Sequence, residues 1–90
     1  MDHRLRGVSQ FVTPSGRYYR WRKIIAYCRR NPGWHRLLPN VPARVVKTVR
    51  LRRSPELRVD GGHLEAYIQH QYQDPNGVQR GDVYLRWTPQ

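Results

Sequence analysis

The chain has 90 residues and a formal net charge of +11, because 17 Arg and Lys oppose six Asp and Glu. This length allows one domain with a modest core, and no apolar run is long enough to span a bilayer. A single cysteine, Cys28, excludes an internal disulfide, and the N-terminus lacks the apolar segment of a secretory signal. We therefore expect a protein of a reducing cytoplasm that does not act at a membrane.

The positive charge is concentrated in the first part of the chain. Residues 1–53 contain fourteen Arg or Lys and one acid, whereas residues 54–90 contain three Arg and five acids. Self-repulsion of such an excess destabilises a compact state, and binding to a polyanion offsets it. Codon bias in a G+C-rich genome would account for Arg in place of Lys, but not for the scarcity of acids. The distribution predicts nucleic acid as the partner, DNA rather than RNA.

Residues 1–16 show no hydrophobic periodicity and end in the helix-breaking run Thr-Pro-Ser-Gly. We interpret them as a flexible basic N-terminal arm. The single folded domain is expected over residues 17–90.

A helical pattern follows this arm. Its apolar stripe repeats at the spacing i, i+3, i+4 and i+7, and consists of Trp21, Ile24, Ile25 and Cys28. Tyr18 extends the stripe backwards, and Asn31-Pro32-Gly33 ends the helix. After it, Trp34 and the pair Leu37-Leu38 are expected to fold back onto the core.

Residues 43–53 carry two conflicting patterns. Asn40 can cap a helix that has Pro42 in its first turn. The apolar stripe of that helix would be Val45, Val46 and Val49. The alternation of residues 47–52 favours an exposed strand instead, and this alternative stays open. We favour a helix of about three turns that ends at Ser54-Pro55.

The last third of the chain predicts antiparallel strands. Leu57 and Val59 alternate before the turn Asp60-Gly61-Gly62. Two longer strands, 64–73 and 78–88, then flank a tight turn at Asp74-Pro75-Asn76-Gly77. Centring this turn on its Pro and Asn gives one apolar face and one polar or aromatic face, which fixes the register. The predicted pairs are Leu64–Trp87, Ala66–Leu85, Ile68–Val83, Glu65–Arg86 and Tyr67–Tyr84.

Together these elements predict an α+β fold in which two N-terminal helices pack on a small antiparallel β-meander or hairpin. A hairpin after two helices also fits a winged-helix arrangement. In that case the hairpin tip, with Asn76 and Arg80, would act as the wing and contact DNA. A homodimer would enlarge the small core, and this alternative stays open.

The basic residues of the two helices are the candidate binding site. Helical residues three or four positions apart share a face, so each helix can carry one basic ridge. Two ridges suit the phosphate rows of a duplex, and no Glu or Asp is interleaved as on an ordinary solvated face. The predicted set is Arg20, Arg22, Lys23, Arg29, Arg30, Arg44, Lys47, Arg50, Arg52 and Arg53, with ridges at Arg22, Arg29, Arg30 and at Arg44, Lys47, Arg50.

Two groups of aromatic residues could add to binding. Tyr19 lies among the Arg-rich residues 17–22 and is free to stack on an unpaired base, whereas Trp21 belongs to the core. Tyr67 and Tyr84 are expected to form an exposed cross-strand pair. This pair is either a simple contact or the centre of a dimer interface.

No catalytic, metal-binding or cofactor-binding site is predicted. The four His lack the spacing of zinc ligands, and the acids are isolated in the sequence. No glycine-rich loop could cradle a phosphate. Cys28 is expected to fill space in the core rather than to act as a nucleophile.

Several short motifs resemble those of small uncharacterised basic proteins carried by bacteriophages of actinobacteria. The motifs are Trp21…Ile25…Arg30-Asn31-Pro32-Gly33-Trp34, Gly62-x-Leu64-Glu65-Ala66 and Asp82-Val83-Tyr84-Leu85-Arg86-Trp87. In that group a Trp-led helix ends in Asn-Pro-Gly before another Trp, and a Phe-Glu-Ala strand pairs with a Val-Tyr-Ala-Arg-Tyr strand. This chain differs in placing Trp34 directly after Gly33, and in having Leu64 in place of the Phe. The resemblance implies a phage gene expressed inside a bacterial host.

The leading hypothesis is a DNA-binding protein of low sequence specificity that acts on the host nucleoid or on transcription, in the host cytoplasm. The alternative is a protein-interaction module whose aromatic, slightly acidic sheet binds and inhibits a host protein. A second alternative is an RNA-binding or ribosome-associated protein.

Overall fold

The structure is a computed structural model that describes residues 10–13 and 18–90. These residues form helix α1 (Trp21–Arg30), strand β1 (His35–Pro42), helix α2 (Arg44–Arg50), the 3-10 helix η2 (Pro55–Leu57), and strands β2 (Gly62–Gln73) and β3 (Gln79–Pro89). The strands make one antiparallel sheet in the order β1-β3-β2. The predicted α+β class and antiparallel sheet are confirmed.

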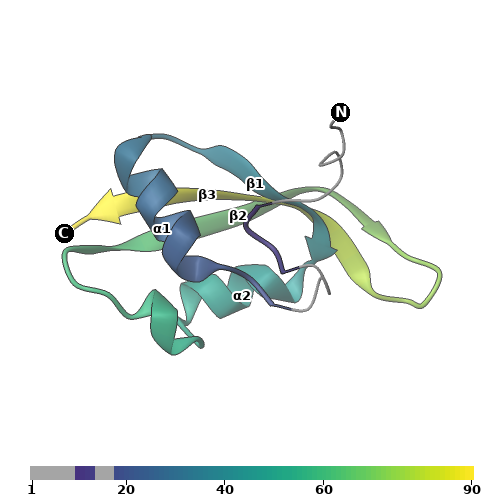
Figure 1. The fold of residues 1–90 in the computed structure, drawn as a ribbon. Helices are drawn as coiled ribbons and strands as arrows, with labels where there is room; N and C mark the ends of the chain where they lie inside the picture. Colours follow the sequence, from purple (N-terminus) through teal and green to yellow (C-terminus); the bar gives the residue numbers. More distant parts are fainter. Residues whose placement is uncertain (1–9, 14–17) are drawn as a thin grey trace.

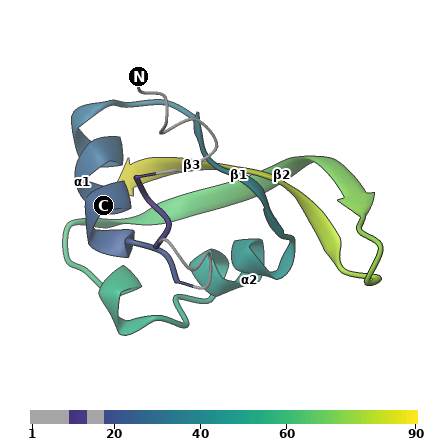
Figure 2. The same ribbon diagram turned by 45° about the vertical axis from the view of Figure 1, so that its right-hand side comes forward.

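The helices and one face of the sheet enclose a single hydrophobic core. In Figures 1 and 2, α1 lies beside the C-terminal end of β3 and α2 lies along β2, while the turn end of the β2–β3 hairpin extends beyond both helices. The most buried side chains come from every layer, namely Ile24, Cys28, Leu38, Val49, Val83 and Leu85. The second face of the sheet carries polar and aromatic side chains.

Helix α1 forms where the apolar spacing predicts it. All four stripe residues are buried, and the exposed sides carry the basic residues. The helix ends at Asn31, whose backbone N–H and side-chain amide both donate to the carbonyl of Tyr27, at 3.0 and 2.8 Å. The prediction that Tyr18 extends the stripe is wrong. Its side chain is 67% exposed, because the chain is extended before Trp21.

Strand β1 was not predicted, and it separates the two helices. The expected arrangement of both helices before the sheet, and with it the winged-helix arrangement, is therefore not confirmed. The two prolines Pro39 and Pro42 disguise the strand, but β1 is an edge strand, where a missing N–H does not break the sheet. Two register shifts interrupt its pairing with β3. Asn40 lies within β1 at the second shift, where its backbone is left-handed with φ of 54°. It therefore does not cap a helix.

Helix α2 is shorter than predicted, because residues up to Pro42 pair with β3. Its buried side is the predicted valine stripe, which excludes the alternative strand over residues 47–52. The helix closes with the N–H of Arg53 bonded to the carbonyl of Thr48 and the N–H of Arg52 bonded to that of Val49. The chain therefore leaves the helix before Ser54-Pro55. Leu57 then lies in η2 rather than in a strand, so the first strand of the predicted meander is absent from the described residues.

The β2–β3 hairpin has the predicted register. All five predicted pairs are present, from Leu64 opposite Trp87 to Ile68 opposite Val83. Beyond Gln69 the register shifts by one residue, and His70 enters the left-handed region with φ of 56°. Opposite this bulge Gly81 has no room for a side chain, since a Cβ there would lie 2.8 Å from the Ile68 side chain and the Gln69 carbonyl oxygen.

Most of the predicted N-terminal arm, residues 1–9 and 14–16, lies outside the described residues. Residues 10–13 belong to the domain. Phe11 is buried and packs edge-on against Tyr27 with ring centroids 5.6 Å apart, and Val12 forms a β-bridge with Tyr19. The domain therefore includes residues that precede the predicted boundary at residue 17.

Candidate nucleic-acid interface

The predicted binding residues all lie at the surface of the helical layer. They occupy the start and exposed sides of α1, the exposed side of α2, and the turn that follows α2. Every one is exposed to solvent. We call this set the basic helical surface, which comprises Arg20, Arg22, Lys23, Arg29, Arg30, Arg44, Lys47, Arg50, Arg52 and Arg53.

The cations of the sheet differ from those of the helices in their pairing. Each arginine of the sheet has a carboxylate partner, with Arg36–Asp82 at 3.2 Å, Arg80–Asp74 at 3.9 Å and Arg86–Glu65 at 2.7 Å. On the basic helical surface only Arg22 has a carboxylate within 4 Å among the described residues, that of Glu56 at 3.6 Å. Arg58, which follows η2, also has no carboxylate within 4 Å among the residues that the structure describes, and it donates to the Arg52 carbonyl. The unpaired arginines and lysines of the described chain therefore lie in the helices and the segments next to them, and not in the strands.

Three members of the two predicted ridges make contacts within the protein. Besides the Arg22 ion pair, the guanidinium of Arg29 lies 4.8 Å from the centroid of the Trp87 ring, and Nε of Arg50 donates to the carbonyl of Ala66 at 3.3 Å. Helix α1 packs on β3 and η2, whereas α2 packs on β2. The free guanidinium and ammonium groups are consequently spread over the layer rather than aligned in two uninterrupted rows.

A cleft of about 770 Å³ opens where the start of α1 meets α2, η2 and β3. Its wall contains Tyr18, Tyr19 and Trp21 from the extended segment and the start of α1, Arg44 from α2, Glu56 from η2 and Arg80 from β3. Burial raises the pKa of Tyr19, and the nearby Arg44 and Arg80 act against that rise. The phenol therefore stays protonated at neutral pH and can donate a hydrogen bond.

The aromatic residues of this cleft correct the prediction for Tyr19. Its ring is half-buried against Trp21, with centroids 5.4 Å apart, so its face is not free. Tyr18 is the exposed ring. The alternation of Arg and aromatic residues predicts a ring for stacking in this segment. Helical periodicity wrongly assigned Tyr18 to the apolar stripe and left Tyr19 as the free ring.

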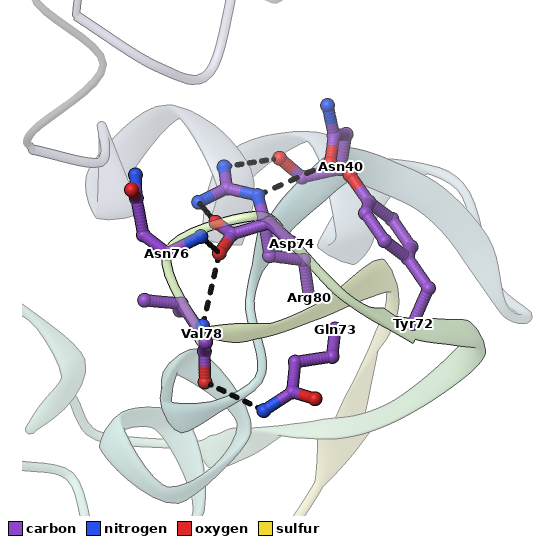
Figure 3. Close-up of polar contacts among 8 residues, drawn as sticks. Asn40, Tyr72, Gln73, Asp74, Asn76, Val78 and Arg80 are labelled. Carbon is purple, nitrogen blue, oxygen red and sulfur yellow. Dashed lines mark hydrogen bonds and ion pairs between the residues drawn. The ribbon is translucent and has the colours of Figure 1, made fainter.

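Arg80 is held in place near the turn of the β2–β3 hairpin. Its Nε donates to Oδ1 of Asn40 at 3.2 Å and its Nη2 donates to the Asn40 carbonyl at 2.8 Å, while Tyr72 donates its hydroxyl to the same Oδ1 (Figure 3). At the tip, Oδ1 of Asp74 accepts the N–H groups of Asn76 and Val78, both at 2.9 Å. The two predicted wing residues therefore lie in different places. Arg80 lines the cleft, whereas Asn76 belongs to a turn closed by its own hydrogen bonds.

Asp82 joins β1 to the hairpin. Its carboxylate accepts the Asn40 N–H at 2.9 Å, the Arg36 guanidinium at 3.2 Å and Nδ1 of His70 at 3.3 Å. The Asn40 N–H, followed by Arg36 and His70, lowers the pKa of Asp82. The folded protein therefore holds this carboxylate ionised to lower pH than the unfolded chain does.

We expect Asp82→Asn to lower the free energy of unfolding by about 1–2 kcal/mol at neutral pH. The wild-type contribution is complete above the unfolded pKa and is lost as pH falls through the lower folded pKa, so wild type loses more stability on acidification than the variant. Urea unfolding at several pH values between about 5 and 2 measures this difference. Parallel loss in both proteins would contradict it.

The second face of the sheet carries an aromatic cluster. Tyr67 and Tyr84 stack with centroids 5.0 Å apart and an interplanar angle of 13°, as the register predicts. Trp34, which was expected in the core, instead packs edge-on against Tyr67 at 4.6 Å and lies under the guanidinium of Arg86. The cross-strand pair is thus part of a larger aromatic group that is partly open to solvent.

Cys28 and the possible metal ligands are the remaining candidates for chemistry. Burial raises the pKa of Cys28 to about 11, which keeps the thiol protonated and unreactive. Among residues 10–13 and 18–90, no group of three or more His, Cys, Asp or Glu could hold a metal ion. Within the same residues no helix has the length and apolarity to cross a membrane.

Comparison with models of known protein families, with curated proteins and with solved structures gave no match. The function must be inferred from the chain itself.

Proposed function

We propose that the protein binds nucleic acid through the basic helical surface, with duplex DNA as the preferred ligand and low sequence specificity. The observation that carries the proposal is the difference in ion pairing between the two layers. The sheet neutralises its arginines with its own carboxylates, whereas nine of the ten cations on the basic helical surface have no carboxylate within 4 Å in the described chain. A polyanion supplies the missing countercharge, and its phosphates release condensed ions on binding.

Contacts made mainly to phosphates would position the protein without reading bases. The side chains of Lys23, Arg30, Lys47 and Arg53 are exposed and form no hydrogen bond or ion pair with other described residues, so they can reorient to follow a phosphate backbone. A protein of this kind, acting on the nucleoid or on transcription in a bacterial host, is the setting that the bacteriophage resemblance suggests.

Fluorescence anisotropy with a labelled random-sequence duplex, titrated across ionic strength, tests the proposal. We expect log K to fall linearly with log salt at a slope of about −4 or steeper. Arg53→Gln should make this slope shallower by about 0.9, because one phosphate contact is lost.

Arg36→Gln is the matched control, since it also removes one charge but from the sheet, where Asp82 already neutralises it. Its slope should equal that of wild type. Absence of duplex binding at moderate salt, or equal effects of the two variants, would contradict the proposal. An RNA hairpin of the same length, bound more tightly than the duplex, would favour the RNA-binding alternative.

The aromatic cluster of the sheet favours a second candidate, a protein-interaction module. Trp34, Tyr67 and Tyr84 lie beside paired charges, and interface centres are enriched in such aromatic residues and depleted of free charge. A protein partner held there should remain bound at high salt, because apolar contacts are not screened. Nucleic acid on the basic helical surface should be released under the same conditions.

A further inference from the structure

We propose that the cleft between Tyr18, Arg44 and Arg80 binds one unpaired nucleotide, with its base on the Tyr18 ring and its phosphate at the two arginines. This inference rests on the proposed function and adds a structural preference to it. The ligand would be DNA in which a single-stranded segment adjoins a duplex held by the basic helical surface. The cleft volume of about 770 Å³ is within the range of about 300–1,000 Å³ common for small-ligand sites.

The Tyr18 side chain is exposed although its backbone is fixed. The N–H of Tyr18 donates to Oγ1 of Thr13 at 3.3 Å, and its carbonyl accepts the N–H of Thr13 at 3.0 Å. The next residue, Tyr19, forms an antiparallel β-bridge with Val12. The segment therefore holds an aromatic ring at the mouth of the cleft, where 67% of the residue is open to solvent. A ring presented in this way offers a stacking surface to any base.

The two arginines of the cleft supply the complement to a phosphate. Arg80 is oriented by Asn40, which accepts hydrogen bonds from its Nε and Nη2, and its Nη1 pairs with Asp74 at 3.9 Å, so Arg80 offers the phosphate a further donor but no uncompensated charge. Arg44 has no carboxylate partner in the described chain. Both arginines line the same cleft as Tyr19, so their guanidinium groups lie on one wall region of it.

The charged residues of the lining give the cleft an acidic side and a basic side. Glu56 enters from η2 and pairs with Arg22 of α1, so the acid lies on the α1 side while the arginines come from α2 and β3. Its carboxylate repels a phosphate but can accept a hydrogen bond from a sugar hydroxyl or a base amino group. The hydroxyls of Thr48 and Ser54 are further donors in the lining.

An unpaired nucleotide fits this arrangement better than a base within a duplex. A paired base is stacked on both faces, and to enter a concave site it must leave the helix at a cost of a few kcal/mol. An unpaired base needs no such step and gains about 1–3 kcal/mol from one aromatic contact. The protein should therefore distinguish DNA with a single-stranded extension from blunt duplex.

Anisotropy with three labelled DNA hairpins tests the inference. One is blunt, one has a short oligothymidine extension, and one has an abasic extension with the same number of phosphates. We expect wild type to bind the base-bearing extension about 5- to 150-fold more tightly than the abasic one. Tyr18→Leu should abolish this preference and leave the affinity for the blunt hairpin unchanged, whereas Tyr18→Phe should keep the preference.

Two controls complete the test. Leu51→Ala changes an exposed side chain outside the cleft and should behave as wild type. Arg44→Gln and Arg53→Gln each remove one charge from the basic helical surface, and only Arg44→Gln should weaken the extended hairpin more than the blunt one.

Equal affinity for the base-bearing and abasic extensions, or a preference that survives Tyr18→Leu, would overturn the nucleotide site. The proposed function would stand if the blunt hairpin still bound with the expected salt dependence. Failure of all three hairpins to bind would overturn both proposals.

Discussion

Replacing Leu38 by alanine is expected to lower the free energy of unfolding by about 2–5 kcal/mol, a large share of the stability of a domain of this size. Leu38 is fully buried although it lies on the edge strand β1, next to a proline. It pairs with Val83 and forms part of the core that both helices cover. Removing its side chain leaves a cavity under the helices, which the sheet cannot close without breaking the β1–β3 pairing.

Urea unfolding followed by circular dichroism measures this loss. Leu51→Ala is the matched control, since Leu51 is 60% exposed and its truncation should change stability by less than about 0.5 kcal/mol. Similar stabilities of the two variants would mean that β1 does not belong to the core.

Gly62→Ala is expected to destabilise the protein by about 2–4 kcal/mol. Gly62 begins β2 with φ of 151°, and an added Cβ would overlap the carbonyl oxygen of Thr88 and lie 2.8 Å from the Trp87 ring. The crowding comes from backbone and a ring held in place by Arg29, so it cannot be relieved by moving a flexible chain end.

Thermal unfolding separates this steric effect from the effect of the backbone angle. Gly33 also has a positive φ, 101°, but no atom lies within 4 Å of its added Cβ. Gly33→Ala should therefore cost only about 1–2 kcal/mol. Equal decreases in Tm for the two variants would show that the approach of Gly62 to β3 is looser than described.

The hairpin register could be predicted from the sequence because each cross-strand pair reports on both strands at once. The bulge at His70 could not, since no turn motif marks it and the close approach of Gly81 to Ile68 and Gln69 exists only in the folded chain. Strand β1 was hidden because Pro39 and Asn40 indicate a turn or a helix cap in isolation. Only pairing with β3 on one side, and solvent on the other, makes them compatible with a strand.

Part of the candidate site could be predicted from the sequence, and part could not. Charge could be located from composition, since a segment rich in Arg without acids must be exposed whichever element it forms. The cleft could not be located, because it brings together Tyr18, Arg44 and Arg80 from segments far apart in the chain. Which of Tyr18 and Tyr19 is exposed depends on where α1 begins. An error of a few residues in that boundary exchanges the buried and the exposed tyrosine.

The separation of paired and unpaired cations makes the described part of the molecule an electric dipole. Near the polyanion proposed as ligand, the resulting torque would turn the helical layer toward it before contact. A copy bound in the proposed way would present the opposite surface, that of Trp34, Tyr67 and Tyr84, to the solvent. A strand coated by this protein would thus acquire an aromatic, nearly neutral exterior in place of its own negative one.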